Sequence, residues 1–305
     1  MTHPPTLTVT APGKVNLGLR VAARRGDGFH ELDTIFAAIS LHDDVAVALE
    51  GEGVHGSVED ARAVKTGEAL PGMTEGNLAW RAADAWLRAA REAANGDDAS
   101  IPTGVRIDLV KRIPIAAGLG GGSSDAAAVL RALDALQPGR VDVKRLAREL
   151  GSDVPFFVAG YPAARGRGRG ERLTPIELPS RWLVLHNPGI SVPVREAYAS
   201  LAAFGPPLDH EAMQDAWRSG ASLRLRNDLQ PGVTGAYPEV RDALNALREA
   251  GLDAPTLSGS GATCFGLASS EEAAYEAAGY VSEMRPGAFT SVVAAPWWGN
   301  EVPRL

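Results

Sequence analysis

The segment from residue 114 to residue 125 has the composition of a loop that binds phosphate. Its small residues are Gly118, Gly120, Gly121, Gly122, Ser123 and Ser124. Glycine lets a ligand come close to the backbone, and the free N–H groups and dipole of a helix N-terminus attract anions. The segment lacks the Lys-Ser/Thr ending of G-x-x-x-x-G-K-[ST] and the last glycine of G-x-G-x-x-G. It is therefore a phosphate loop of another kind, or a glycine-rich turn that only reverses the chain.

A strand and a helix flank this loop in the sequence. Over residues 105–109 apolar side chains alternate with charged ones, which is the period of a half-buried strand. Over residues 129–136 the apolar side chains fall on one face of a helix. The loop is thus expected to end at a helix N-terminus, where an anion binds.

Two ionisable residues among apolar neighbours are candidates for catalysis. Asp153 follows a helix predicted for residues 143–150, and Lys14 lies on an N-terminal strand whose other side chains alternate toward a core. A carboxylate can take the proton of an attacking hydroxyl, and a cation at ~4 Å stabilises it by roughly 4 kcal/mol at an effective dielectric of about 20. From residue types alone, Asp153 fits a helix-terminal carboxylate better than a base, and Lys14 fits a surface lysine.

Four segments, in this order, resemble motifs of the GHMP kinase superfamily. They are residues 11–17 (Ala-Pro-Gly-Lys-Val-Asn-Leu), 25–32 (Arg-Gly-Asp-Gly-Phe-His-Glu-Leu), the glycine loop, and 257–262 (Leu-Ser-Gly-Ser-Gly-Ala). The resemblance implies an α+β fold of two domains. Residues 1–160 would form an N-terminal ATP-binding and catalytic domain that resembles ribosomal protein S5. Residues 161–305 would form a ferredoxin-like C-terminal domain, with the substrate in the cleft between the two.

The resemblance also implies a reaction and a set of site residues. Asp153 matches the catalytic base and Lys14 its electrostatic partner. The residues that match the ATP loop are Pro114, Ile115, Ala116, Ala117, Gly118, Leu119, Gly120, Gly121, Gly122, Ser123 and Ser124. The expected reaction is ATP-dependent phosphorylation of a small-molecule hydroxyl, with Mg²⁺ accompanying ATP and a hydroxyl of Ser123 or Ser124 helping to hold the ion. Among the six histidines no pair has metal-ligand spacing, so no metal held by a protein cluster is expected.

The triple glycine is most similar to the superfamily members that phosphorylate the 2-hydroxyl of a methylerythritol bearing a cytidine diphosphate group, a step of non-mevalonate isoprenoid synthesis. In that group of kinases Phe29 and His30 match residues on one side of the cytosine, and Tyr198 matches an aromatic on the other. Asn16 matches a residue at the methylerythritol end. The alternative is another GHMP kinase, acting on homoserine, mevalonate or a sugar.

Composition bounds the remaining possibilities. The chain has 305 residues, a formal net charge of −7 and a single cysteine, Cys264. The acidic balance argues against nucleic acid as a partner, and no apolar run is long enough for a membrane span, so a cytoplasmic monomer or weak homodimer is expected. One feature favours a different class, a nucleic-acid-binding module without catalysis: the Arg-Gly run over residues 165–172. Because the run is short and has no interleaved aromatics, we predict a solvated hairpin or linker.

Overall fold

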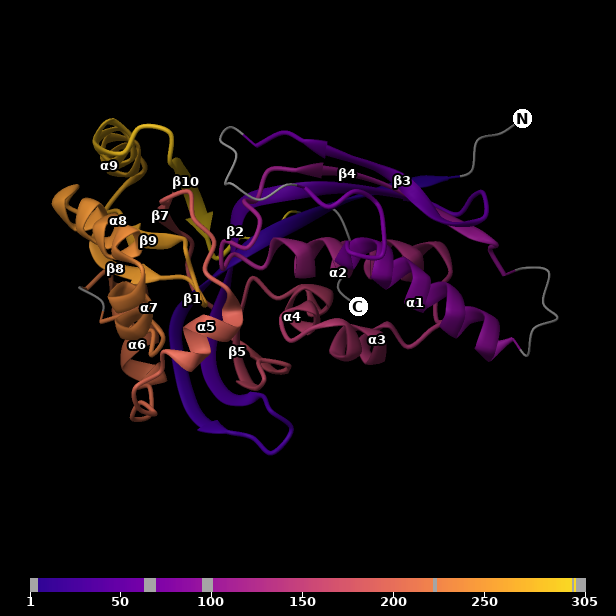
Figure 1. Cartoon of the computed structure of the whole chain (residues 1–305), viewed down its shortest axis with the longest axis horizontal. Helices are drawn as coiled ribbons and strands as arrows, with labels where there is room; N and C mark the ends of the chain where they lie inside the picture. Colours follow the sequence, from indigo (N-terminus) through magenta and orange to yellow (C-terminus); the bar gives the residue numbers. More distant parts are fainter. Residues whose placement is uncertain (1–4, 63–69, 95–100, 222–223, 298, 300–305) are drawn as a thin grey trace.

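Two β-sheets with helices packed on them form the molecule (Figure 1). The structure is a computed structural model that describes residues 5–62, 70–94, 101–221, 224–297 and 299. The first sheet comes from the first 175 residues and the second from the remainder. This arrangement confirms the predicted α+β class.

The first sheet is mostly antiparallel. Its strands are β1 (Thr6–Arg24), β2 (His30–Ala48), β3 (Gly53–Asp60), β4 (Gly104–Lys111), β5 (Ala163–Gly168) and β6 (Arg172–Pro175). The strand order is β3-β4-β2-β5-β6, with β1 also paired to β2, and only β3 and β4 among these pairs run parallel. As predicted from the alternation of its residues, β4 buries Val105, Ile107 and Leu109.

Four helices accompany the first sheet on one face. They are α1 (Leu78–Ala93), α2 (Gly121–Leu136), α3 (Val143–Leu150) and α4 (Val154–Ala159). The apolar face of α2 is buried in the core that this sheet and these helices share. Because α2 begins at Gly121, the glycine loop leads directly from β4 into a helix N-terminus, as expected.

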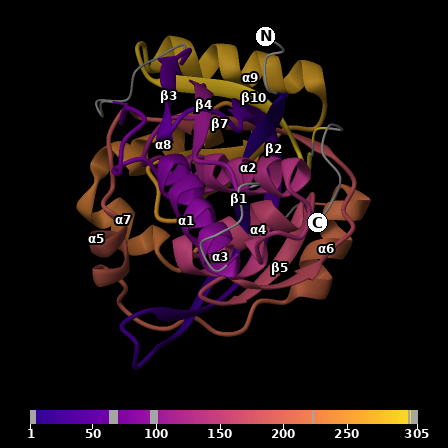
Figure 2. The same ribbon diagram turned by 90° about the vertical axis from the view of Figure 1, so that its right-hand side faces the viewer.

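The second sheet is fully antiparallel, in the order β10-β7-β9-β8. Its strands are β7 (Arg181–Asn187), β8 (Asp253–Leu257), β9 (Cys264–Leu267) and β10 (Phe289–Ala295). The helices of this half are α5 (Val194–Ala199), α6 (His210–Ser219), α7 (Gln230–Ala236), α8 (Pro238–Glu249) and α9 (Glu271–Met284). Figure 2 shows α9 beside β10 at the far end of this half. In the described part of the chain, no helix combines the length and the apolar character needed to cross a membrane.

The first sheet extends past the domain boundary predicted at residue 160. Strands β5 and β6 pair with each other, and β5 pairs with β2. The Arg-Gly run is therefore the β5–β6 hairpin and belongs to the first sheet instead of linking two domains. We propose that the division between the domains follows Pro175.

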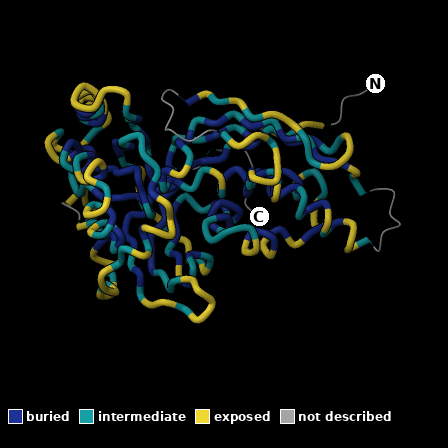
Figure 3. The backbone as a smooth tube through the Cα atoms, in the orientation of Figure 1, coloured by how far each residue is buried: buried dark blue, intermediate teal, exposed yellow. Residues whose placement is uncertain are grey.

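The hairpin formed by β1 and β2 projects beyond both halves of the molecule (Figures 1 and 2). Its tip is exposed, whereas the strands behind it are buried (Figure 3). This hairpin carries Lys14 in its buried part and Phe29 at its tip, so one element reaches from the core to the surface.

Candidate active site

Lys14 is buried and held by three oxygen atoms. Its Nζ donates to Asn16 Oδ1 at 2.8 Å and to the carbonyl oxygen of Gly118 at 2.9 Å. The third is Asp153 Oδ2, at 3.6 Å. The Lys14 side chain is only 5% exposed, so Lys14 is not the surface lysine that its residue type alone would suggest.

Asp153 stands at the N-cap position of α4, yet its side chain makes no capping hydrogen bond. The side chain is 30% exposed and lines the same cavity as Lys14. Because the carboxylate does not cap the helix, the helix-terminal interpretation loses its physical basis. The structure brings the two predicted catalytic residues together, one from β1 and one from the start of α4.

The glycine loop lies next to Lys14, which contacts its backbone. Gly118 and Gly120 have φ values of 77° and 71°, which glycine adopts without strain. A Cβ on Gly118 would lie 2.2 Å from the carbonyl oxygen of Ser258, so only glycine fits there. The backbone N–H of Lys14 donates to the Leu119 carbonyl at 2.8 Å, which ties the loop to β1.

The loop forms one wall of a cavity of about 1390 Å³. All residues predicted to bind ATP line this cavity except Leu119 and Ser124, whose side chains are buried. Pockets for one small ligand usually measure about 300–1,000 Å³. The cavity is therefore large enough for a nucleotide and a second molecule side by side.

Aromatic rings also line the cavity. The rings of His30 and Tyr198 stack with centroids 4.7 Å apart, and Phe29 is 47% exposed with the Arg169 guanidinium 4.8 Å from its ring centroid. Since no base fits between two rings already in contact, the predicted clamp with cytosine between His30 and Tyr198 is not the arrangement seen here. The exposed ring of Phe29 and the outer faces of the stacked pair are what a base would meet.

Electrostatics in this part favour neutral hydrogen-bonding groups. Burial, followed by the positive charge of Arg24, lowers the pKa of His30, so the ring is neutral and offers one donor and one acceptor. Burial, followed by the charge of Asp153, holds the pKa of Tyr198 well above its usual range.

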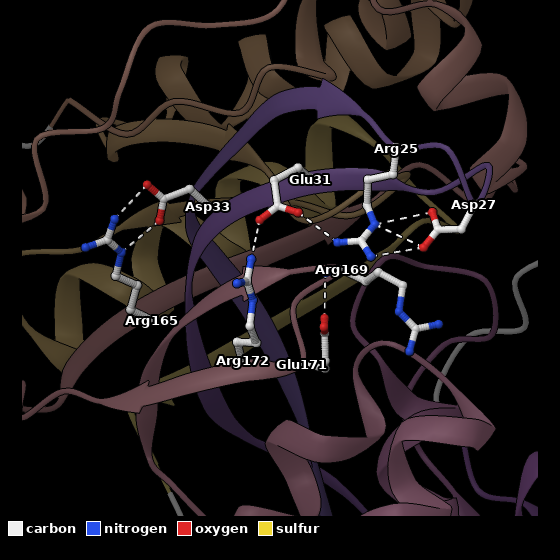
Figure 4. A network of polar contacts seen from close by, with 8 residues as sticks. All are labelled: Arg25, Asp27, Glu31, Asp33, Arg165, Arg169, Glu171 and Arg172. Atoms are coloured by element: carbon white, nitrogen blue, oxygen red, sulfur yellow. Dashed lines mark hydrogen bonds and ion pairs between the residues drawn. The ribbon is translucent and has the colours of Figure 1, made fainter.

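Ion pairs anchor the hairpin tip that carries Phe29 and His30. Glu31 pairs with Arg25 on the same hairpin and with Arg172 of β6 (Figure 4). Asp27 pairs with Arg25 and accepts the backbone N–H of Phe29 at 3.1 Å. Arg172 of the Arg-Gly run therefore helps to hold the β1–β2 hairpin tip in place.

The third glycine-rich segment reaches the loop from the second half of the chain. Ser258 Oγ donates to the Gly118 carbonyl at 3.0 Å, and the N–H of Thr263 donates to the Ala117 carbonyl at 3.1 Å. Gly259 and Ser260 line the cavity. Both halves of the molecule therefore contribute to one site.

A buried ion cluster beside the loop was missed by sequence reasoning. Lys111 Nζ contacts Asp43 Oδ2 and lies 2.6 Å from Asp125 Oδ2. Burial raises the pKa of Asp125 to about 8. Although burial opposes its charge, the two carboxylates hold the pKa of Lys111 above its usual value. Asp125 is thus a buried partner of Lys111.

Models of two protein domains match this sequence. The GHMP kinases N terminal domain matches residues 77–161, and the GHMP kinases C terminal matches residues 208–286. Together with the relatives described next, these matches show that the chain belongs to the GHMP kinase family. They confirm the family that the four motifs predict.

The curated relatives share a name that is more specific than that of the family. A 4-diphosphocytidyl-2-C-methyl-D-erythritol kinase of Thermus thermophilus is 44% identical over 270 residues, which are 88% of this chain and 90% of the relative. The protein of the same name from Deinococcus radiodurans is 40% identical and covers 98% of this chain and 94% of its own length.

Solved structures show similarity both to a kinase of the same name and to another kinase with a similar fold. A crystal structure of 4-(cytidine 5'-diphospho)-2C-methyl-D-erythritol kinase has a TM-score of 0.79 and 42% identity, and covers 94% of this chain and 99% of that chain. Homoserine kinase from Cytophaga hutchinsonii has a TM-score of 0.67 at 18% identity, covering 97% of this chain and 96% of that chain. At that identity the second match shows only the fold.

Proposed function

We propose that this GHMP kinase transfers the γ-phosphoryl group of ATP to the 2-hydroxyl of 4-diphosphocytidyl-2-C-methyl-D-erythritol, a step of non-mevalonate isoprenoid synthesis. The observation that carries the proposal is the Lys14–Asp153 pair, 3.6 Å apart, on the wall of a cavity lined by the glycine loop and by the aromatic residues. The names of the relatives with high coverage support this acceptor.

Each part of the site has a role in the transfer. The Asp153 carboxylate takes the proton of the acceptor hydroxyl while its oxygen bonds to the γ-phosphorus and the bond to the ADP oxygen breaks. The Lys14 ammonium stabilises the negative charge on the attacking oxygen. Backbone N–H groups of the loop and the N-terminus of α2 hold the phosphates.

Mg²⁺ fits this site as a companion of the nucleotide. Within the described residues no group of three or more His, Cys, Asp or Glu side chains can hold a metal. Mg²⁺ often takes most of its ligands from substrate phosphates and water, and Ser123 on the cavity wall is the side chain we propose for it. The Ser124 hydroxyl is buried and has no hydrogen-bond partner among the described residues, so it is the second candidate. The bound ion would neutralise charge on the phosphate oxygens.

On the acceptor side, Asn16 positions the reacting end and the rings hold the base. Asn16 Nδ2 donates to Thr34 Oγ1 at 2.8 Å while its Oδ1 accepts from Lys14, so its orientation is set. Phe29, His30 and Tyr198 line the cavity and present flat faces and one polar ring edge, which suits a pyrimidine.

The test is ADP release by the purified protein with ATP, Mg²⁺ and a panel of acceptors. The panel contains the cytidyl acceptor, the same methylerythritol phosphate without cytidine, homoserine and mevalonate. We expect turnover with the cytidyl acceptor only. Equal or better turnover with an acceptor that has no base would overturn the substrate assignment and leave the family intact.

A further inference from the structure

Three buried charged side chains in contact with one another connect the two ends of the glycine loop. At the entry, Asp43 Oδ1 accepts the backbone N–H groups of Arg112 and, at 2.9 Å, of Ile113. At the exit, Asp125 is the fifth residue of α2 and is buried. Lys111 bridges them, since its Nζ contacts both carboxylates.

This cluster is among the best-buried charged groups of the described chain. The side chains of Asp43, Lys111 and Asp125 are 0%, 6% and 3% exposed. Burying charges costs free energy that hydrophobic residues of the same size would not cost. Lys111 and Asp125 also line the cavity, although neither belongs to the Lys14–Asp153 pair. A buried charge cluster in this position therefore calls for a role besides stability.

Net charge is not that role. Two carboxylates and one ammonium carry no positive excess, so the cluster does not attract phosphate over a distance. The remaining contribution of the cluster is to fix the geometry of the loop. A Cβ placed on Gly121 would lie 3.4 Å from Lys111 Nζ. The bridge therefore packs against the first residue of α2, which lines the cavity.

We propose that Asp43, Lys111 and Asp125 are positioning residues that hold the glycine loop in the conformation that receives the nucleotide phosphates. The inference rests on the proposed function, because it takes the loop as the ATP site. The cluster acts on ATP through the loop backbone. Its loss should weaken ATP binding and leave the acceptor site unchanged.

The first variant is Asp125→Asn, which keeps the shape and replaces the carboxyl group by an amide that cannot carry a negative charge. We expect the KM for ATP to rise about ten-fold, as for a lost charge-assisted hydrogen bond that aligns a site, with the KM for the acceptor within about two-fold of wild type. Amide hydrogen exchange over residues 112–125 should become faster in the ligand-free protein. The matched control is Asp33→Asn, which removes a paired carboxylate from β2, the strand that carries Asp43; Asp33 pairs with Arg165 at 2.8 Å. The control should change neither the KM for ATP nor exchange in the loop.

A second variant separates positioning from stability. Lys111→Met and Asp125→Leu, combined with Asp43→Asn so that no unpaired charge stays buried, replace the bridge by neutral side chains, which often restores or increases stability. We expect a melting temperature near that of wild type together with a raised KM for ATP and faster loop exchange.

A stable triple variant with wild-type KM for ATP and wild-type loop exchange would overturn the inference. The same holds if Asp125→Asn raises both KM values equally. ATP binding to the wild-type protein, measured by calorimetry, tests the proposed function separately: without it the proposed function fails, while the exchange data still decide whether the cluster orders the loop.

Discussion

Asp153 combines a partly exposed carboxylate with a buried ammonium neighbour, which is the environment a general base needs. Asp153→Asn keeps the size of the side chain and removes the proton acceptor. We expect kcat to fall by roughly 10²–10⁴-fold, the usual contribution of a general base, with ATP binding nearly unchanged. Steady-state kinetics and an ATP titration of the same preparation check this. A variant that retains more than about a third of the wild-type kcat would remove Asp153 from the mechanism.

Phe29 and Tyr198 are the residues whose rings we expect to bind the base. Stacking on an aromatic ring is worth ~1–3 kcal/mol, so Phe29→Ala and Tyr198→Ala should each weaken cytidine diphosphate binding by roughly five-fold to a hundred-fold. Tyr198 also supports His30 by stacking on it, so the effects of the two substitutions should not add.

Calorimetric titration of cytidine diphosphate and of ATP against wild type and both variants measures these effects. ATP affinity is the internal control and should stay constant, because neither ring belongs to the glycine loop. The cytidyl assignment fails if wild type does not bind cytidine diphosphate, or if both variants bind it as tightly as wild type does.

At the level of elements, the start of α2 offers a substitution that separates ligand binding from folding. A Cβ on Gly122 would meet nothing within 4 Å, and its φ is not positive. Alanine in a helix is more stable than glycine by roughly 0.5–1 kcal/mol. Gly122→Ala should therefore raise the melting temperature and at the same time weaken ATP binding, because the methyl group occupies space at the phosphate site.

Gly118→Ala is the contrasting substitution in the same loop. Its Cβ would collide with backbone of the third glycine-rich segment, so stability and activity should both fall. Thermal unfolding and ATP titration of the two variants measure the difference. If Gly122→Ala binds ATP as well as wild type does, the phosphates do not lie against the first turn of α2.

For the whole molecule, a buried histidine makes stability depend on pH. Burial, followed by the charge of Arg285, lowers the pKa of His186 to about 4. The unfolded chain then binds a proton near pH 6.5 that the folded chain does not bind until about pH 4. Stability is complete above pH 6.5 and is lost as the pH falls through that window, by about 3 kcal/mol at most.

Urea unfolding of wild type and His186→Gln between pH 7 and pH 4.5 isolates this contribution from the other titrating groups. The difference in unfolding free energy between the two proteins should shrink as the pH falls. A difference that stays constant over the window would show that His186 is not a source of acid sensitivity.

Much of the architecture follows from local patterns. Alternation over residues 105–109 predicted β4, and the row of glycines predicted the loop and the start of α2, because helix starts and tight turns depend on nearby residues. The continuation of the first sheet past residue 160, the boundary predicted from the sequence, had no such local signal. The partner of β5 is β2, more than a hundred positions away, and pairing at that distance leaves no local signature.

Part of the candidate site was likewise predictable from the sequence, and part was not. Sequence motifs by themselves determined the residue types that the chemistry requires: the glycine loop, Lys14 and Asp153. Lys111 is in phase with the buried residues of β4, as Asp43 is with those of β2, and this was the one available signal for the buried cluster. Only the tertiary structure decided that these charges meet, and that Lys14 lies beside Asp153. The reason is physical: a buried charge is tolerated only where folding brings an opposite charge to it, and the two partners come from distant parts of the chain.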